Sequence, residues 1–89
     1  MLNVVVLVSG GGTNLQAVID NVENGFIENA KIVQVIASKE DAYALTRAKN
    51  HNIKGVYIGK KNYPVMSERT DAIIRALDEE KTDLVILAG

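Results

Sequence analysis

The residues best suited to chemistry in this chain are three consecutive glycines followed by a hydroxyl and an amide side chain. Gly10, Gly11 and Gly12 follow an apolar run and Ser9, and Thr13 and Asn14 open a stretch with helical spacing. Glycine at such a place either turns the chain or lets a ligand approach the backbone. Successive N–H groups at the start of a helix attract anions. The pattern therefore indicates a structural turn or an anion-binding loop, and it leaves both open.

Three kinds of phosphate loop have glycines in this setting, and their spacing separates them. A nucleoside triphosphate loop ends in Gly-Lys-Ser/Thr, whereas Gly12 is followed by Thr13 and Asn14. The dinucleotide pattern G-x-G-x-x-G has a glycine where this chain has Leu15. The acidic residue that would bind the ribose, expected just after the second strand, is also missing. A dinucleotide-dependent oxidoreductase therefore stays only as a third alternative. A phosphomonoester seat fits best, in which Gly11 and Gly12 admit the anion while Thr13 and Asn14 donate to it.

The start of the same helix also has a purely structural interpretation. The sequence "TNLQ" matches a capping box, with Thr13 as the N-cap and Gln16 three residues later. We expect Thr13 to cap the helix and also to donate to the ligand. Among the glycines, we expect Gly10 to make the turn off the strand.

The elements that must position this loop alternate along the chain. The predicted strands are Val4–Val8, Lys31–Ala37, Ile53–Ile58 and Asp83–Ala88. One helix begins at Thr13 and is closed by Gly25, the next spans Asp41–Lys49 with Ser38 or Asp41 as its cap, and the last follows Pro64. Strands that alternate with helices predict an α/β fold with a parallel sheet and right-handed crossovers.

The fold class that we predict is a half-Rossmann βαβαβαβ unit with a four-stranded sheet in the order 3-2-1-4. The first strand is then central, buried on both faces, and its glycine loop lies near the switch point where such sheets bind ligands. The helix faces expected in the core carry apolar residues at helical spacing. These are Leu15, Val18, Ile19 and Val22; Ala42, Leu45 and Ala48; and Met66, Ile73, Ile74 and Leu77.

Composition excludes several classes of partner and site. Ten Lys and Arg against eleven Asp and Glu give a net charge of −1, which offers no reason to expect a nucleic acid or a membrane as partner. The chain has no cysteine and only one histidine, His51, so we expect no metal site and interpret His51 as a solvated loop residue. The first residues lack the features of a signal peptide, which favours a cytoplasmic protein.

The loop and two further segments resemble a known family. "NVVVLVSGGGTNLQAVID", "VIASKEDAYALTRAKNHNI" and "DLVILAG" are similar to phosphoribosylglycinamide formyltransferases, whose opening reads S-G-x-G-[ST]-N-[LF]-[QE]-[AS]-[IL] after a strand. The resemblance covers all 89 residues, and Val18 departs from the pattern only by a similar apolar side chain. Gly11 occupies the variable position of this pattern, so the resemblance implies that Gly11 tolerates replacement, and we expect Gly12 to be the glycine that a phosphate requires.

The resemblance implies an enzyme of purine biosynthesis. Its reaction transfers a formyl group from 10-formyltetrahydrofolate, the folate donor, to the amine of glycinamide ribonucleotide. In that family the residues aligned with Gly12, Thr13 and Asn14 hold the phosphate of the ribonucleotide, in agreement with the phosphomonoester seat. The phosphate end of glycinamide ribonucleotide is thus the partner expected at this loop.

Two departures from the family limit what the resemblance implies. The catalytic Asn, His and Asp lie in a second half that nothing here matches, so we expect no catalytic residue in this chain and an inactive isolated chain. Counting back from Gly89 places Met66 where many members have an arginine, with Arg69 nearby. In those members the arginine contacts the folate or nucleotide side of the cleft, and we assign this role to neither Met66 nor Arg69.

The last predicted strand leads to expectations about domain organisation. We interpret residues 1–89 as a single N-terminal phosphate-binding half of a formyltransferase domain, truncated after the fourth strand. An apolar strand at a sheet edge is prone to pairing. We therefore expect the complementary C-terminal half, or a second copy, to bind along that edge. The alternative function is a stand-alone half-Rossmann module that binds a phosphorylated metabolite without catalysis.

Overall fold

Four parallel strands form one sheet in the order β3-β2-β1-β4, as predicted. The computed structural model describes residues 1–89. Its elements in chain order are β1 (Leu2–Val8), α1 (Thr13–Glu23), β2 (Ala30–Ala37), α2 (Tyr43–Asn50), β3 (Lys54–Tyr57), α3 (Met66–Glu79) and β4 (Leu84–Leu87). The predicted α/β class and strand order are therefore confirmed, and the strand bounds differ from the prediction by one or two residues.

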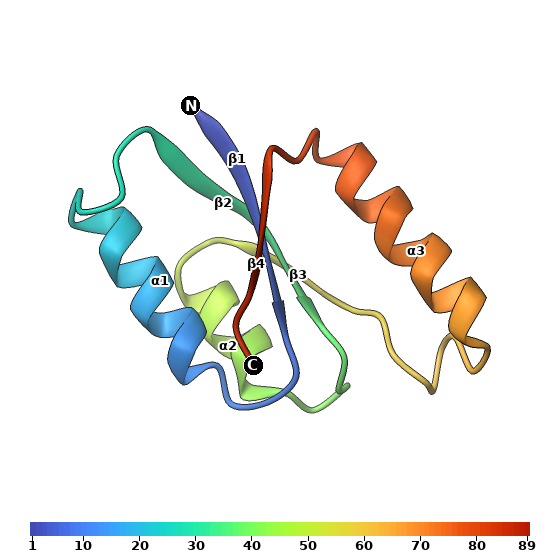
Figure 1. The fold of residues 1–89 in the computed structure, drawn as a ribbon. Helices are drawn as coiled ribbons and strands as arrows, with labels where there is room; N and C mark the ends of the chain where they lie inside the picture. Colours follow the sequence, from blue (N-terminus) through green and yellow to red (C-terminus); the bar gives the residue numbers. More distant parts are fainter.

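The helices lie on both faces of the sheet, α1 and α2 on one and α3 on the other (Figure 1). This distribution follows from the handedness of the crossovers. The chain steps from β1 to β2 to β3 in one direction and then returns across the sheet to β4. Because βαβ crossovers are right-handed, a reversal of direction moves the connecting helix to the opposite face.

The central strand β1 is buried on both faces, as its run of valines predicts. Val4, Val6 and Val8 pack with α1 and α2, in one cluster that includes Leu15 and Ile19. A second apolar cluster lies on the α3 face of the sheet. It contains Val5, Ile36, Ile58 and Ala72, with Leu7, Val33, Val56, Tyr63, Ile73, Ala76 and Leu77 packed against them.

The apolar face predicted for α3 is only partly correct. Ile73 and Leu77 pack in the core as expected, but Met66 is 71% exposed and Ile74 is 49% exposed. Ala72, which the apolar pattern did not single out, is the buried residue of this helix. Met66 is the first residue of α3, where the helix has not yet come over the sheet (Figure 1). Helical spacing therefore identified the apolar side of the helix, but not how far along the helix or how wide around it the buried face extends.

The cap predicted for α2 is wrong. Ala42 is the N-cap, in an extended conformation, and neither Ser38 nor Asp41 caps the helix with its side chain. A turn closes just before the helix, since the Ala42 N–H donates to the carbonyl of Lys39 at 3.2 Å. This turn places the small Ala42 side chain in the core, where a polar cap residue would be buried. For α1 the predicted ending is confirmed, because Gly25 follows the C-cap Asn24 with a φ of +86°.

Strand β4 lies at an edge of the sheet and pairs only with β1. Its side chains Leu84, Val85 and Leu87 are exposed. At its start, the Asn3 amide of β1 donates to the carbonyls of Glu80 and Lys81 at 3.4 and 3.1 Å. None of the three helices is both long and apolar enough for a membrane crossing.

Candidate functional site

The glycine loop lies at the carboxyl edge of the sheet, between the ends of β1 and β4. Residues 9–12 connect β1 to α1, and the Ser9 hydroxyl donates to the carbonyl of Gly89 just after β4. Strand order reverses here, because β2 lies on one side of β1 and β4 on the other. The predicted loop is thus at the switch point where open α/β sheets bind ligands.

The backbone of this loop presents a run of N–H groups without acceptors in the protein. The N–H groups of Gly10 to Leu15 make no hydrogen bond, and the first helical bond runs from the Gln16 N–H to the Gly12 carbonyl at 2.8 Å. These donors stand at the positive end of the dipole of α1. Gly11, Thr13 and Asn14 are exposed and Gly10 is half-buried, so these four residues face solvent, whereas Gly12 and Leu15 are buried. The arrangement is suited to an anion.

Gly12 is required by its own conformation and by its neighbours. It is buried and has a φ of +84°, which L side chains rarely adopt. A Cβ at this position would lie 2.8 Å from the Ala44 Cβ and 2.9 Å from the Ala44 Cα. A Cβ at Gly11 would have nothing within 4 Å. The loop thus needs glycine at Gly12 in order to pack on α2, which is a reason that the sequence did not reveal.

The predicted capping box is wrong. Gly12 is the N-cap of α1, Thr13 is its first residue, and no side chain caps the helix. Left-handed Gly12 already provides the non-helical conformation that an N-cap needs, and this moves Thr13 one place into the helix. The hydroxyl of Thr13 and the amide of Asn14 therefore make no hydrogen bond within the protein. Both are available as donors beside the free N–H groups.

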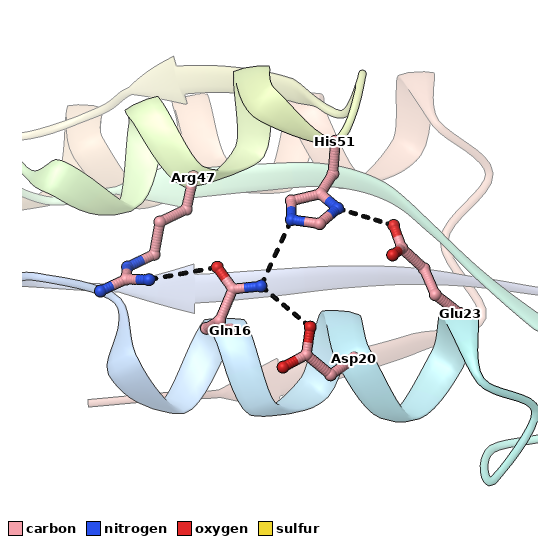
Figure 2. Close-up of polar contacts among 5 residues, drawn as sticks. All are labelled: Gln16, Asp20, Glu23, Arg47 and His51. Atoms are coloured by element: carbon pink, nitrogen blue, oxygen red, sulfur yellow. Dashed lines mark hydrogen bonds and ion pairs between the residues drawn. The ribbon is translucent and has the colours of Figure 1, made fainter.

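Arg47 of α2 contacts the loop, and sequence reasoning missed it. Its Nε donates to the Gly11 carbonyl at 2.9 Å. Its Nη1 donates to Gln16 Oε1 at 3.1 Å, and this second bond is drawn in Figure 2. Its guanidinium also lies over the ring of Tyr43, 5.0 Å from the centroid. Arg47 is far from the loop in sequence, and a helix face carries no signal of which loop it will meet.

His51 lies beside this arginine and is not the solvated loop residue that we predicted. It is the C-cap of α2, with its side chain only 26% exposed. Its Nε2 lies 3.3 Å from Gln16 Nε2, and its Nδ1 lies 2.8 Å from Glu23 Oε2 (Figure 2). Because the Gln16 amide nitrogen is a donor, His51 Nε2 accepts and Nδ1 carries the proton donated to Glu23. His51 thus has a structural role between α1 and α2.

A hollow of about 850 Å³, apart from the glycine loop, lies where the loops after β2 and β3 meet α3. Lys61 and Glu40 face each other across these loops at 3.1 Å, and this hydrogen bond and charge raise the pKa of Lys61. Arg69 also lines the hollow, but its Nη1 donates to the carbonyls of Tyr63 and Pro64 and so holds the chain that enters α3. No three side chains of His, Asp or Glu gather in a group that suits a metal ion.

Comparisons with known proteins agree with one another. A family model described as formyl transferase matches residues 2–89. The chain is 45% identical over 89 residues to the phosphoribosylglycinamide formyltransferase of Haemophilus influenzae, covering 100% of this chain and 42% of that protein. It is 39% identical over 103 residues to the enzyme of the same name from Saccharomyces cerevisiae, covering 100% of this chain and 48% of that protein.

Solved structures show the same similarity in three dimensions. Glycinamide ribonucleotide transformylase 1 from Symbiobacterium toebii matches with a TM-score of 0.92 and 36% identity, over 100% of this chain and 42% of that one. The chain thus spans less than half the length of the curated relatives and of the solved structure that it matches. The similarity covers the whole sheet and its three helices.

Proposed function

The chain belongs to the formyl transferase family, and on that basis we propose that it is the substrate-phosphate-binding part of a phosphoribosylglycinamide formyltransferase. The proposed reaction belongs to purine biosynthesis. It transfers a formyl group from 10-formyltetrahydrofolate to the amine of glycinamide ribonucleotide. The alternative of a stand-alone binding module is not favoured, because the relatives described above are formyltransferases by name.

One observation carries the proposal for the loop: the N–H groups from Gly10 to Leu15 have no acceptor in the protein. A phosphate monoester offers several acceptor oxygens and a charge between about −1.5 and −2 near neutral pH. It therefore complements a row of donors at the positive end of a helix better than a neutral ligand does. This supports the phosphate of a ribonucleotide as the group bound here.

Four residues have roles in the proposed phosphate seat. Gly11 and Gly12 leave the backbone accessible to the anion. Thr13 and Asn14 add a hydroxyl and an amide donor from the first turn of α1. The seat would hold one end of the substrate so that its distant amine meets the formyl donor, which is binding energy used for positioning. We assign no residue of this chain to the formyl donor and none to the chemical step.

The setting of the protein is also a proposal. We place it in the cytoplasm. The apolar edge strand β4 would bind either the complementary part of a formyltransferase domain or a second copy of the chain. The exposed Leu84, Val85 and Leu87 support such pairing.

Titration with ribose 5-phosphate tests the seat directly. We expect the amide signals of Gly11, Gly12 and Asn14 in an NMR spectrum to shift as ribose 5-phosphate or glycinamide ribonucleotide is added. Ribose, which lacks the phosphate, is the matched control and should leave them unchanged. The Gly25 amide, beyond the other end of the same helix, should not respond. If these loop amides do not move, the proposed seat is wrong.

A formyl-transfer assay tests whether the catalytic residues lie outside this chain. The 89-residue chain alone should transfer no formyl group, and activity should appear on addition of the C-terminal half of a relative such as the Haemophilus influenzae enzyme. Activity of the chain alone would contradict the assignment of catalysis to residues outside it.

A further inference from the structure

The side chain of Arg47 is fixed on three sides. Nε donates to the Gly11 carbonyl at 2.9 Å and Nη1 to Gln16 Oε1 at 3.1 Å. The guanidinium lies 5.0 Å from the centroid of the Tyr43 ring. Figure 2 shows it reaching from α2 past the first turn of α1. These contacts make Arg47 a rigid bridge between α2 and the glycine loop.

The bridge determines the direction of one peptide group. The Gly11–Gly12 peptide bond is trans, as are all others, so its carbonyl and its N–H point in opposite directions. Because Arg47 holds the carbonyl, the Gly12 N–H is turned away from the guanidinium. The Arg47 Cδ also lies 3.1 Å from where a Cβ on Gly12 would stand, so the stem packs against the same residue.

The loop has little else to hold it in place. A Cβ at Gly10 or at Gly11 would touch nothing within 4 Å, and neither residue has a side chain. Glycine is the residue with the most conformational freedom to lose. A flexible backbone must be ordered before its N–H groups can converge on a ligand, and ordering costs affinity unless it is done beforehand.

We propose that Arg47 is a positioning residue, which orders the glycine loop so that its N–H groups are aimed at a phosphate. This inference rests on the proposed function, since it takes the loop to be a phosphate seat. Arg47 acts through Gly11 and Gly12 and does not itself bind the anion. Two of its donor groups, Nε and Nη1, are already bonded to protein acceptors.

The first test replaces the guanidinium and keeps an apolar stem. Arg47→Met removes both donors, and Lys49→Met on the same helix is the matched control, because it removes one positive charge from an exposed residue that does not contact the loop. In the free chain, ¹⁵N order parameters of Gly11 and Gly12 should fall in Arg47→Met and stay unchanged in Lys49→Met. Affinity for ribose 5-phosphate should fall about tenfold in Arg47→Met alone, because the loop must then be ordered when the ligand binds.

Two further variants separate positioning from charge. Arg47→Lys keeps the charge but not the paired donors, so it should leave the loop mobile and binding weakened. Gln16→Met keeps Arg47 but removes the acceptor of Nη1 and should loosen Gly11 and Gly12 to a smaller degree. This variant keeps the test informative if Arg47→Met fails to fold.

The possible failures are distinguishable. If Arg47→Lys binds ribose 5-phosphate as tightly as the wild-type chain does, only the positive charge matters, and the positioning role is overturned. Weakened binding with unchanged order parameters would make Arg47 a ligand of the phosphate, which also overturns it. If the wild-type chain does not bind ribose 5-phosphate at all, the proposed function fails, whatever the order parameters show.

Discussion

At the scale of single residues, Gly11 and Gly12 are identical in the sequence and opposite in their surroundings. Gly11 is exposed with open space around it, whereas Gly12 is buried against Ala44 with a φ of +84°. The loop therefore combines a position that tolerates change with one that does not.

A matched pair of alanine variants tests the contrast. Gly12→Ala combines an unfavourable φ with a Cβ 2.8 Å from the Ala44 Cβ. We expect it to lower the free energy of unfolding by about 2–4 kcal/mol, from the left-handed strain and the overpacking together. Gly11→Ala should change it by less than about 1 kcal/mol. Urea denaturation measures both, and equal losses would contradict the packing argument.

A negative charge introduced at Asn14 should weaken the binding of a phosphate. Asn14→Asp keeps the size of the side chain but replaces an amide donor with a carboxylate beside the proposed phosphate. Two like charges about 4 Å apart near a protein surface repel by several kcal/mol, so ribose 5-phosphate binding should weaken at least about tenfold.

Asn24→Asp is the control for this variant. It makes the same change at the C-cap of the same helix, and the side-chain oxygen that accepts from the Phe26 N–H is kept. Its affinity for ribose 5-phosphate, measured by calorimetry, should equal that of the wild-type chain. Equal weakening in both variants would mean that net charge, and not a site at Asn14, determines binding.

The site could be predicted from the sequence only in part. The pattern located the loop, and the separate status of Gly12 followed from the family resemblance. The capping residue was wrong because the backbone conformation of Gly12, not the side-chain chemistry of Thr13, determines where α1 begins. Arg47 and His51 were missed as partners of the loop and of α1 because both contacts depend on how α2 packs across from it.

At the scale of elements, β4 depends on a small polar clamp at its start. The Asn3 amide donates to the carbonyls of Glu80 and Lys81, and the Asp83 N–H donates to the Asn3 carbonyl at 2.8 Å. An edge strand has hydrogen-bonded neighbours on one side only, so its local stability rests heavily on how its ends are held. Asn3 fastens the turn after α3 to the central strand.

Asn3→Ala should therefore loosen β4 more than the rest of the sheet. We expect a loss of about 1–2 kcal/mol in the free energy that protects the amides of Leu84–Leu87 from hydrogen exchange. Asn62→Ala is the control, because Asn62 makes a similar clamp with Tyr57 and Gly59 in the loop after β3. It should leave the β4 amides unchanged. Equal protection of β4 in wild type and Asn3→Ala would contradict the role of the clamp.

The order and type of the elements could be predicted because they depend on local apolar runs. Each of the four strands and three helices is present near its predicted position. The predictions that were wrong concern features that depend on residues far away in the sequence. These are the caps of α1 and α2, and the exposure of Met66 and Ile74. A sequence period shows which side of a helix is apolar, but not how much of its length, or how wide a face around it, the sheet covers.

At the scale of the whole molecule, the loop and the exposed edge meet. The glycine loop follows β1, and the Ser9 hydroxyl donates to the Gly89 carbonyl after β4. Whatever pairs with β4 would therefore lie close to the proposed phosphate seat (Figure 1). A partner bound along the edge strand, as proposed above, would thus lie beside the proposed phosphate seat.

The apolar character of that edge leads to the last prediction. Leu87 is 78% exposed on an edge strand whose outer hydrogen-bonding groups lack a neighbour, and such edges associate unless a charge protects them. We expect the 89-residue chain to self-associate with rising concentration, and Leu87→Lys to raise the dissociation constant at least about tenfold. Phe26→Lys is the control, since Phe26 is 83% exposed in the turn after α1, away from the edge. Sedimentation velocity over a range of concentrations measures all three proteins. Association that Leu87→Lys and Phe26→Lys reduce equally would show that apolar exposure in general, and not the β4 edge, drives it.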